Sequence, residues 1–406
     1  MNVSLSRPAL WPEIRIVLFA AMVIFLYTIG IGILNGTDLV DFDQRRILGH
    51  VHGGTLGWLT LAVYAASLWL FGEQQPVSEK ERSVIRAMVG LATVSFPIYV
   101  AAFSLTFGVW RPITGVLALA AIVAFTAWVG YRARSMTLGV PHLGFLAALG
   151  TSVVGGILGV LLGLDIATDT NWLPDGGEGA HPGTMVVGFL IPVTLAMVEW
   201  SFFFPSPPAA TRAGKIQMLF PFLGGVVLMV ALLLDIVPLA PIAVILEIVG
   251  IGIFVKRLWP NFKSVDWKTA NPHRYAVLAA VAVVFVIGLA QYLIIRYDGD
   301  FDNVPEHLLL ALDHTQFIGA VTNSVFALLL AVTMVRGRGN NVDNVVFILV
   351  NVGIIGFASG LLADSTIMKR IFAPTMGVGL LIGLGTYAWR LAQERVGGMA
   401  PAKGSR

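Results

Sequence analysis

Twelve long apolar stretches run along this chain, and they limit what it can fold into more than any other feature. Each approaches the roughly 20 residues that a helix needs to cross the hydrocarbon core of a membrane. Apolar and polar residues do not alternate within them, so helices are expected rather than strands. The sequence therefore predicts an all-α integral membrane protein with twelve transmembrane helices. We expect these helices over residues 14–35, 50–71, 84–107, 111–131, 143–164, 181–204, 216–234, 238–256, 274–296, 308–335, 343–363 and 370–392.

The composition agrees with a membrane protein. Of the 406 residues, 57% are hydrophobic and only 12% are charged, whereas about 25% of a soluble domain is charged. The sequence has no cysteine, which excludes disulfides, iron–sulfur clusters, thiolate zinc sites and covalently attached c-type haem. We expect a single membrane domain over residues 1–406, with a disordered tail over 397–406.

The distribution of positive charge predicts how the chain crosses the membrane. Loops and helix ends that follow the even-numbered expected helices carry fourteen lysines and arginines, against six after the odd-numbered ones. The positive-inside rule then puts both termini in the cytoplasm. We predict a multi-pass protein of a bacterial-type inner (plasma) membrane. The net charge of +3 reflects these cytoplasmic loops, so we expect contact with lipid and no binding of nucleic acid.

Three histidines recur at nearly equal intervals along the chain. His52, His181 and His314 are separated by 129 and 133 residues, and each lies near the outer end of an expected helix. An imidazole is costly inside a membrane, so each copy requires a partner. The spacing predicts three pseudo-symmetric units of four helices, with the three imidazoles at one depth around a shared metal or haem. The expected units cover about 14–131, 143–256 and 274–392.

One segment around the first histidine carries a family resemblance. It reads Arg45-Arg46-Ile47-Leu48-Gly49-His50-Val51-His52-Gly53-Gly54-Thr55-Leu56-Gly57-Trp58. Together with the number of helices and the histidines in the second, sixth and tenth of them, it resembles subunit I of the haem–copper oxidases and the related nitric oxide reductases. The nitric-oxide-response membrane haem proteins are similar but more distant. In helix number the resemblance covers nearly the whole chain, and in motifs it covers three short segments.

The resemblance implies roles for five residues. His52 and His314 would be the two axial ligands of a b-type haem, and His181 would lie where the family's sixth helix supplies a copper ligand. Arg45 and Arg46 would pair with the haem propionates on the outer side. The cofactors implied are one haem b, with copper as a second candidate.

The chain departs from the family's pattern at the second metal centre. Leu312 and Gln316 stand where the oxidases have a second histidine, and 216–234 lacks the family's histidine pair for copper. Helix 181–204 also lacks the family's tyrosine near copper. The ligand set therefore resembles a degenerate oxidase. At most one bis-histidine haem is expected, beside an incomplete or different second site.

Two further residues are candidates for the site. His50 lies two positions before His52, so the two side chains point about 200° apart on a helix and cannot both face one ligand. His52 is expected to face inward, and His50 to form hydrogen bonds beside the haem site. Glu247 lies near the middle of 238–256, where a charged carboxylate is costly. It is a candidate for a proton relay, or for a protonated hydrogen bond between helices.

The sequence leaves three functions open. The leading hypothesis is a membrane b-type haem protein in electron transfer or in nitric oxide or copper handling, rather than full oxygen reduction. Such a protein would require an electron-donor protein or second subunit, and it is an oxidoreductase if His181 completes a second site. The first alternative is a haem-free copper or zinc transporter or sensor that uses His52, His181 and His314 together. The second is a transporter or assembly factor without cofactors on the same scaffold.

Overall fold

All the named elements are helices in the computed structural model, which describes residues 7–106, 108–297, 303–334 and 340–393. Within these residues, eleven spans are long and apolar enough to cross a membrane. They have 22 to 29 residues, which at 1.5 Å per residue corresponds to about 33–44 Å. The chain is therefore an all-α, multi-pass membrane protein, as predicted. The tail expected to be disordered, 397–406, lies outside the described residues.

Nine of the long helices in the described part of the chain are uninterrupted. One of the nine, α10, is not among the eleven apolar spans, because its apolar stretch includes three charged residues, Glu247, Lys256 and Arg257. With α10 included, a helix is found at each of the twelve expected places. The nine are α1 (Trp11–Gly36), α4 (Glu79–Leu105), α5 (Trp110–Ala133), α6 (Val140–Thr168), α9 (Arg212–Leu233), α10 (Ala240–Lys263), α11 (Pro272–Arg296), α14 (Asn341–Leu362) and α15 (Thr366–Gln393).

Three other spans are composite, because each contains a π-helical segment between two α-helices. π-Helical turns are rare and often lie at functional sites. None of the three segments contains a proline, although Pro192 lies just after one of them, so proline is not their common cause. The three spans are α2 (Gln44–His52), η1 (Gly53–Thr60) and α3 (Leu61–Gly72); α7 (Gly177–Gly183), η2 (Thr184–Leu190) and α8 (Ile191–Phe202); and α12 (Glu306–His314), η5 (Thr315–Thr322) and α13 (Asn323–Thr333).

The composite spans form the centre of the molecule. In their most apolar stretches, 78 to 89% of the residues are buried, whereas the share is 33 to 56% in the other eight apolar spans. The π-helical segments also meet one another, with η5 packed against both η1 and η2. The central position of these spans explains why they carry few exposed residues although they are no more apolar than their neighbours.

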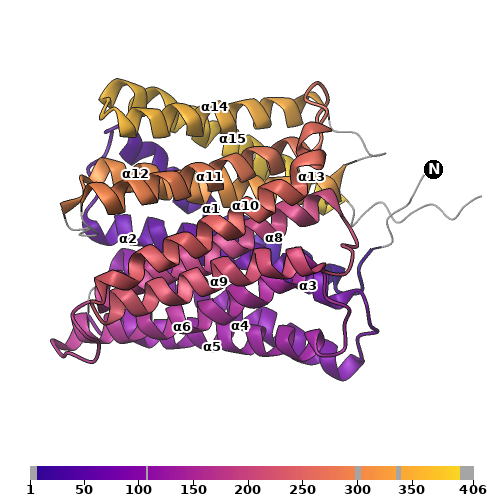
Figure 1. Ribbon diagram of the computed structural model, residues 1–406, viewed down its shortest axis with the longest axis horizontal. Coiled ribbons are helices and arrows are strands. Elements are labelled where there is room, and N and C mark those ends of the chain that lie inside the picture. Colours follow the sequence, from indigo (N-terminus) through magenta and orange to yellow (C-terminus); the bar gives the residue numbers. More distant parts are fainter. Residues whose placement is uncertain (1–6, 107, 298–302, 335–339, 394–406) are drawn as a thin grey trace, which may run out of the picture.

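The central spans differ in burial between their two ends. In Figure 1, α2 and α12 lie toward the left and α3, α8 and α13 toward the right, so the spans run in parallel. Every residue of α3 is buried, whereas Gly49 is the one buried residue of α2. In α12 the one buried residue is Ala311. We call the end where α2, α7 and α12 begin the histidine end, and its central helices keep accessible surface.

Three buried ion pairs hold the opposite end together. Each joins an arginine near the end of α5, α10 or α15 to a carboxylate on another helix. The carboxylates of Glu199 and Asp343 are almost fully buried, so their charges depend on these partners. The pairs are Arg132–Glu81 at 3.5 Å, Arg257–Glu199 at 2.8 Å and Arg390–Asp343 at 2.9 Å.

Candidate functional site

Four histidines at the histidine end share one hydrogen-bond arrangement. A carbonyl oxygen can only accept a hydrogen bond, so an imidazole nitrogen that contacts one must carry the proton. Here that nitrogen is Nδ1 in each case, which leaves the lone pair on Nε2. This is the tautomer that ligates a metal through Nε2, with Nδ1–H held by the main chain. The contacts are His50 to Thr28 O at 2.9 Å, and His52 to Leu48 O, His181 to Gly155 O and His314 to Leu310 O, each at 2.8 Å.

His142 at the opposite end shows what a purely structural histidine looks like in this chain. Its Nδ1 accepts a hydrogen bond from the Gly139 N–H at 3.0 Å, and its Nε2 lies 3.3 Å from Leu70 O. Both nitrogens are therefore used, and the side chain is 1% exposed. His50, His52, His181 and His314 are instead half-buried. They combine a free lone pair on Nε2 with access from outside the protein core.

The His50 ring lies against Gly32 of α1, where an added Cβ would be 3.1 Å from His50 Cε1. The His314 ring meets the edge of Phe357 on α14, with 5.1 Å between ring centroids. We call His50 and His314, which α1 and α14 border, the first histidine pair.

The His52 ring contacts side chains of α4. It stacks on Phe103 of α4 with 4.0 Å between centroids, and Tyr99 meets it edge-on at 5.4 Å. The Arg111 guanidinium lies 4.6 Å from the centre of the Phe103 ring. His181 lies on the second composite span, where its ring packs against Gly159 of α6: a Cβ added there would be 2.6 Å from His181 Cε1.

The resemblance put His52 opposite His314. The side chains of His50 and His52 point about 200° apart on α2, so only one of them can face His314, and which of the two does so stays a prediction. In addition, the described residues contain no group of three His, Cys, Asp or Glu side chains placed to hold one metal ion. His52, His181 and His314 are therefore not in such a group in this structure, and the tri-histidine alternative stays a prediction.

Arg45 and Arg46 border the first turn of α2. Arg45 Nη2 lies 2.6 Å from Asp43 Oδ2, and the Arg46 main-chain N–H donates to Asp43 Oδ1 at 3.1 Å. The side-chain hydrogen bond from Arg45 and the main-chain one from Arg46 lower the pKa of Asp43 below its ordinary value. Both arginines therefore help to hold the N-terminus of the helix that carries His50 and His52.

Glu247 lies apart from the histidines. Its side chain is 4% exposed on α10 and rests against α9, where a Cβ added at Gly224 would be 2.9 Å from its Cγ. No hydrogen bond joins its carboxyl to any other residue in the described parts of the chain. Close packing against glycine accounts for its position, and a relay role stays a prediction.

Several residues beside the candidate site carry no signal in the sequence. Phe103, Arg111 and Gly159 come from three different helices and meet the histidines through the tertiary fold. Gln316 follows His314 by two residues and is fully buried, yet neither of its amide atoms has a hydrogen-bond partner among the described residues. A buried amide without a partner costs about 1–3 kcal/mol. In the sequence, Gln316 stands out only because it follows His314 by two residues.

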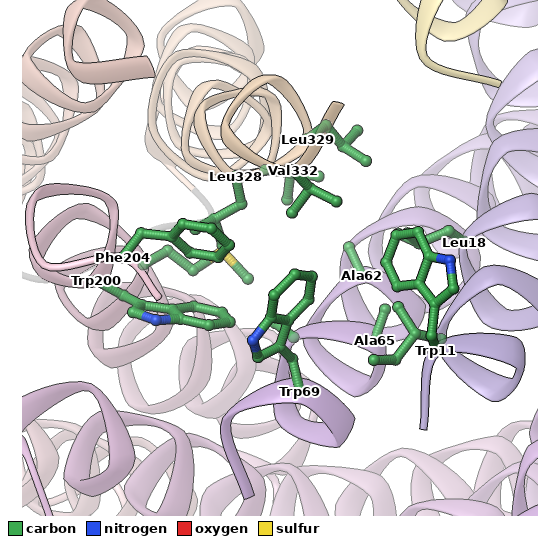
Figure 2. A pocket seen from close by; sticks show the side chains of 14 residues that line it. Trp11, Leu18, Ala62, Ala65, Trp69, Trp200, Phe204, Leu328, Leu329 and Val332 are labelled. Atoms are coloured by element: carbon green, nitrogen blue, oxygen red, sulfur yellow. The ribbon is translucent and has the colours of Figure 1, made fainter. Parts of the chain in front are cut away.

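A small cavity of about 40 Å³ lies at the opposite end from the histidines. In Figure 2, Trp69 lies between Trp11 and Trp200, and Leu328 comes from the facing helix α13. Trp11 and Trp69 meet edge to face at 5.8 Å. A cavity of this size and apolar lining has no polar groups to hold water and is far too small for a haem.

No family model matches the chain, and no curated protein sequence matches it. Its class is therefore defined by its own fold: a multi-pass, all-helical membrane protein with accessible histidines at one end of its central helices.

Proposed function

We propose that this protein is a membrane b-type haem protein with an architecture like that of subunit I of the haem–copper oxidases. The first histidine pair, His50 and His314, holds the haem. The observation that carries this proposal is the shared tautomer of the histidines, with Nδ1–H donated to the main chain and Nε2 left for a metal. Two imidazoles on one haem iron leave no open position, which suits electron transfer.

Two repeated features support three four-helix units over about 14–131, 143–256 and 274–392. Each unit contains one composite span, with a π-helical segment shortly after His52, His181 or His314. Each unit also ends in a helix whose last turns carry an arginine paired with a buried or half-buried carboxylate. A threefold internal repeat is what an oxidase-like arrangement of the helices requires.

The residues around the first pair fit a haem. Gly32 leaves room against the His50 ring, and Phe357 provides an apolar wall beside His314. Arg45 and Arg46 lie at the same end of α2, where both pair with Asp43, and they would share their positive charge with the propionates. When bound, haem supplies a one-electron iron couple. The protein's part is to hold the two imidazoles in the ligating tautomer and to shield the ring from water.

The orientation follows from the positive-inside rule. The histidine end would face the outside of a bacterial-type inner membrane, with both termini in the cytoplasm. An electron-donor protein or second subunit would then reach the haem from the outer side. The missing second histidine near Gln316 and the absence of histidine in 216–234 favour electron transfer, or nitric oxide or copper handling, over full oxygen reduction.

The decisive experiment is a pyridine haemochrome assay on the purified protein expressed with ample haem, with metal analysis in parallel. We expect a b-type spectrum with a low-spin reduced α-band. His50→Ala and His314→Ala should each lose the haem held by this pair, and imidazole added to His314→Gly should restore low-spin haem. His273→Ala, at the opposite end, should keep the wild-type spectrum. Folded, monodisperse protein without haem absorbance overturns the proposal, and copper or zinc found in its place supports the haem-free alternative.

A further inference from the structure

We infer that two threonines, Thr60 and Thr322, set the rotation of the histidine-bearing helices α2 and α12, and with it which imidazole can reach the proposed haem. Both are positioning residues, because each acts through the π-helical segment that it ends. The haem part of this inference rests on the proposed function. The rotation itself does not, and it can be measured without a cofactor.

The segments η1 and η5 share their length, their place and their last residue. Each begins directly after one of the histidines, has eight residues and ends in a threonine. The Thr60 hydroxyl donates to Thr55 O at 3.0 Å, and the Thr322 hydroxyl donates to Phe317 O at 2.8 Å. Both hydrogen bonds therefore reach five residues back along the chain.

This five-residue spacing is particular to these two threonines. Every other threonine hydroxyl that bonds within its own described helix reaches a carbonyl three or four residues back, for example Thr55 to Val51 O at 2.9 Å. The next turn of an α-helix lies four residues away, whereas that of a π-helix lies five residues away. A hydroxyl bond to the fifth residue is therefore lost if the segment becomes α-helical, so it stabilises the π-helical form.

The π-helical form matters because it controls the rotation of the helix before it. An α-helix turns by about 100° per residue, and a π-helical turn takes up one residue more. If η1 became α-helical, α2 would rotate by about 100° relative to α3. Every residue of α3 is buried, whereas Gly49 is the one buried residue of α2, so α2 is the part that would move. His50 and His52 would both turn away from their present neighbours.

The two π-helical segments are also joined to each other. The Trp58 indole N–H in η1 donates to the Thr322 hydroxyl oxygen at 3.0 Å. The hydroxyl that holds η5 in its π-helical form thus also accepts a hydrogen bond from η1. Thr60 and Thr322 are 1% and 0% exposed, so water does not replace either bond. The rotations of α2 and α12 are therefore set together.

A disulfide between α2 and α4 reports the rotation without a cofactor. The chain has no cysteine, so Gly49→Cys with Ser104→Cys gives a single possible pair. A Cβ at position 49 would lie 3.1 Å from the Ser104 Cβ, slightly less than the roughly 3.5–4.5 Å of a disulfide, and the bonded sulfur replaces the hydroxyl between them. The pair should cross-link in membranes on mild oxidation. With Thr60→Val added, the yield should fall about fivefold or more, as expected from the loss of one buried hydrogen bond.

The haem readout uses the same substitutions at Thr60 without the cysteines. Thr60→Val should lose low-spin haem, measured by pyridine haemochrome and the reduced α-band, because the ligand on α2 has turned away. Added imidazole should restore the low-spin spectrum, since a free ligand replaces the misplaced one. A residue that only stabilised the fold would show no such rescue. Thr60→Ser keeps the hydroxyl and should keep both the cross-link and the haem.

Thr55→Val is the matched control within the same segment. Its hydroxyl makes an ordinary bond four residues back, to Val51 O, and the carbonyl that Thr60 uses remains in place. The cross-link yield and the haem content should stay at wild-type levels. If Thr60→Val does not accumulate in membranes, Thr60→Ala carries the same two measurements, because it also removes the hydroxyl and adds no bulk.

The outcomes separate this inference from the proposed function. Loss of the cross-link in Thr60→Val but not in Thr55→Val supports the rotation, whether or not haem is bound. An undiminished cross-link in Thr60→Val overturns it, as do equal losses in both variants or no cross-link in the wild-type background. Protein that cross-links as expected but binds no haem overturns the proposed function and leaves the rotation standing.

Discussion

The indole N–H of Trp58 donates a hydrogen bond of 3.0 Å to the hydroxyl of Thr322, a residue 264 positions further along the chain. Trp58 lies in η1 and Thr322 ends η5, so the bond joins two central spans directly below the histidine end. The Thr322 hydroxyl in turn donates to Phe317 O, five residues earlier, at 2.8 Å. Trp58 also stacks on Phe25 with 4.5 Å between ring centroids. This contact sets how the spans carrying His50 and His314 lie relative to each other.

Thr322→Val should destabilise the protein. The substitution keeps the shape of the side chain but leaves the buried indole N–H of Trp58 without an acceptor, which costs about 1–3 kcal/mol. Thr322→Ser keeps the hydroxyl and should lose less. Thermal unfolding in detergent, followed by circular dichroism, measures both. If Thr322→Ser loses as much stability as Thr322→Val, the hydrogen bond is not the main contribution of this side chain.

Gly32→Ala should weaken haem binding by the first pair. Its new Cβ would be 3.1 Å from His50 Cε1, so the ring must move by a few tenths of an ångström. Gly30→Ala is the matched control on α1, because nothing lies within 4 Å of its Cβ. The control should gain stability, up to the roughly 1 kcal/mol by which alanine exceeds glycine in a helix. Haem content and the reduced α-band report the difference, and equal spectra in both variants would count against His50 as a ligand.

Glu199→Gln should cost about 3 kcal/mol of stability. Arg257 contacts both carboxylate oxygens of Glu199 at 2.8 Å, and Gln217 donates to one of them at 3.1 Å. Removing the carboxylate leaves a guanidinium without its counter-charge, which typically costs 3–5 kcal/mol. We take the lower end because 21% of the Arg257 side chain stays exposed.

The matching double variant, Glu199→Met with Arg257→Met, should be close to wild type in stability, since apolar side chains often replace a buried ion pair without loss. A double-mutant cycle of thermal unfolding tests this. Additive losses from the two single substitutions would show that the two side chains act independently.

The stability contributed by Asp43 should depend on pH. Hydrogen bonds from Arg45 and Arg46 lower the pKa of Asp43 in the folded protein, so folding favours its carboxylate. The contribution is complete above the ordinary pKa of about 3.9 and is lost as the pH falls through the lowered folded value. Unfolding temperatures of wild type and Asp43→Asn should therefore differ at pH 6 and converge toward pH 3. A difference that does not change with pH would rule out this role.

The helices were predictable because a membrane imposes long apolar runs that stand out in any one stretch of sequence. The ends of the helices were less predictable. The helix expected over 84–107 begins at Glu79, because Ser78 caps a polar first turn that extends past the apolar residues. The helix expected over 238–256 continues to Lys263 for the same reason, with a charged end beyond the apolar core.

By itself, the sequence determined the membrane class, the twelve helices and the fact that His50 and His52 point in different directions. These follow from local properties: the length of apolar runs and the 100° turn per residue of a helix. Only the tertiary structure decided that Phe103 stacks on His52, that Gly159 packs against His181, and that π-helical segments follow three of the histidines. Such relationships depend on how each span is rotated about its own axis, and packing between helices distant in sequence sets that rotation. No pattern within a single stretch of sequence gives this rotation.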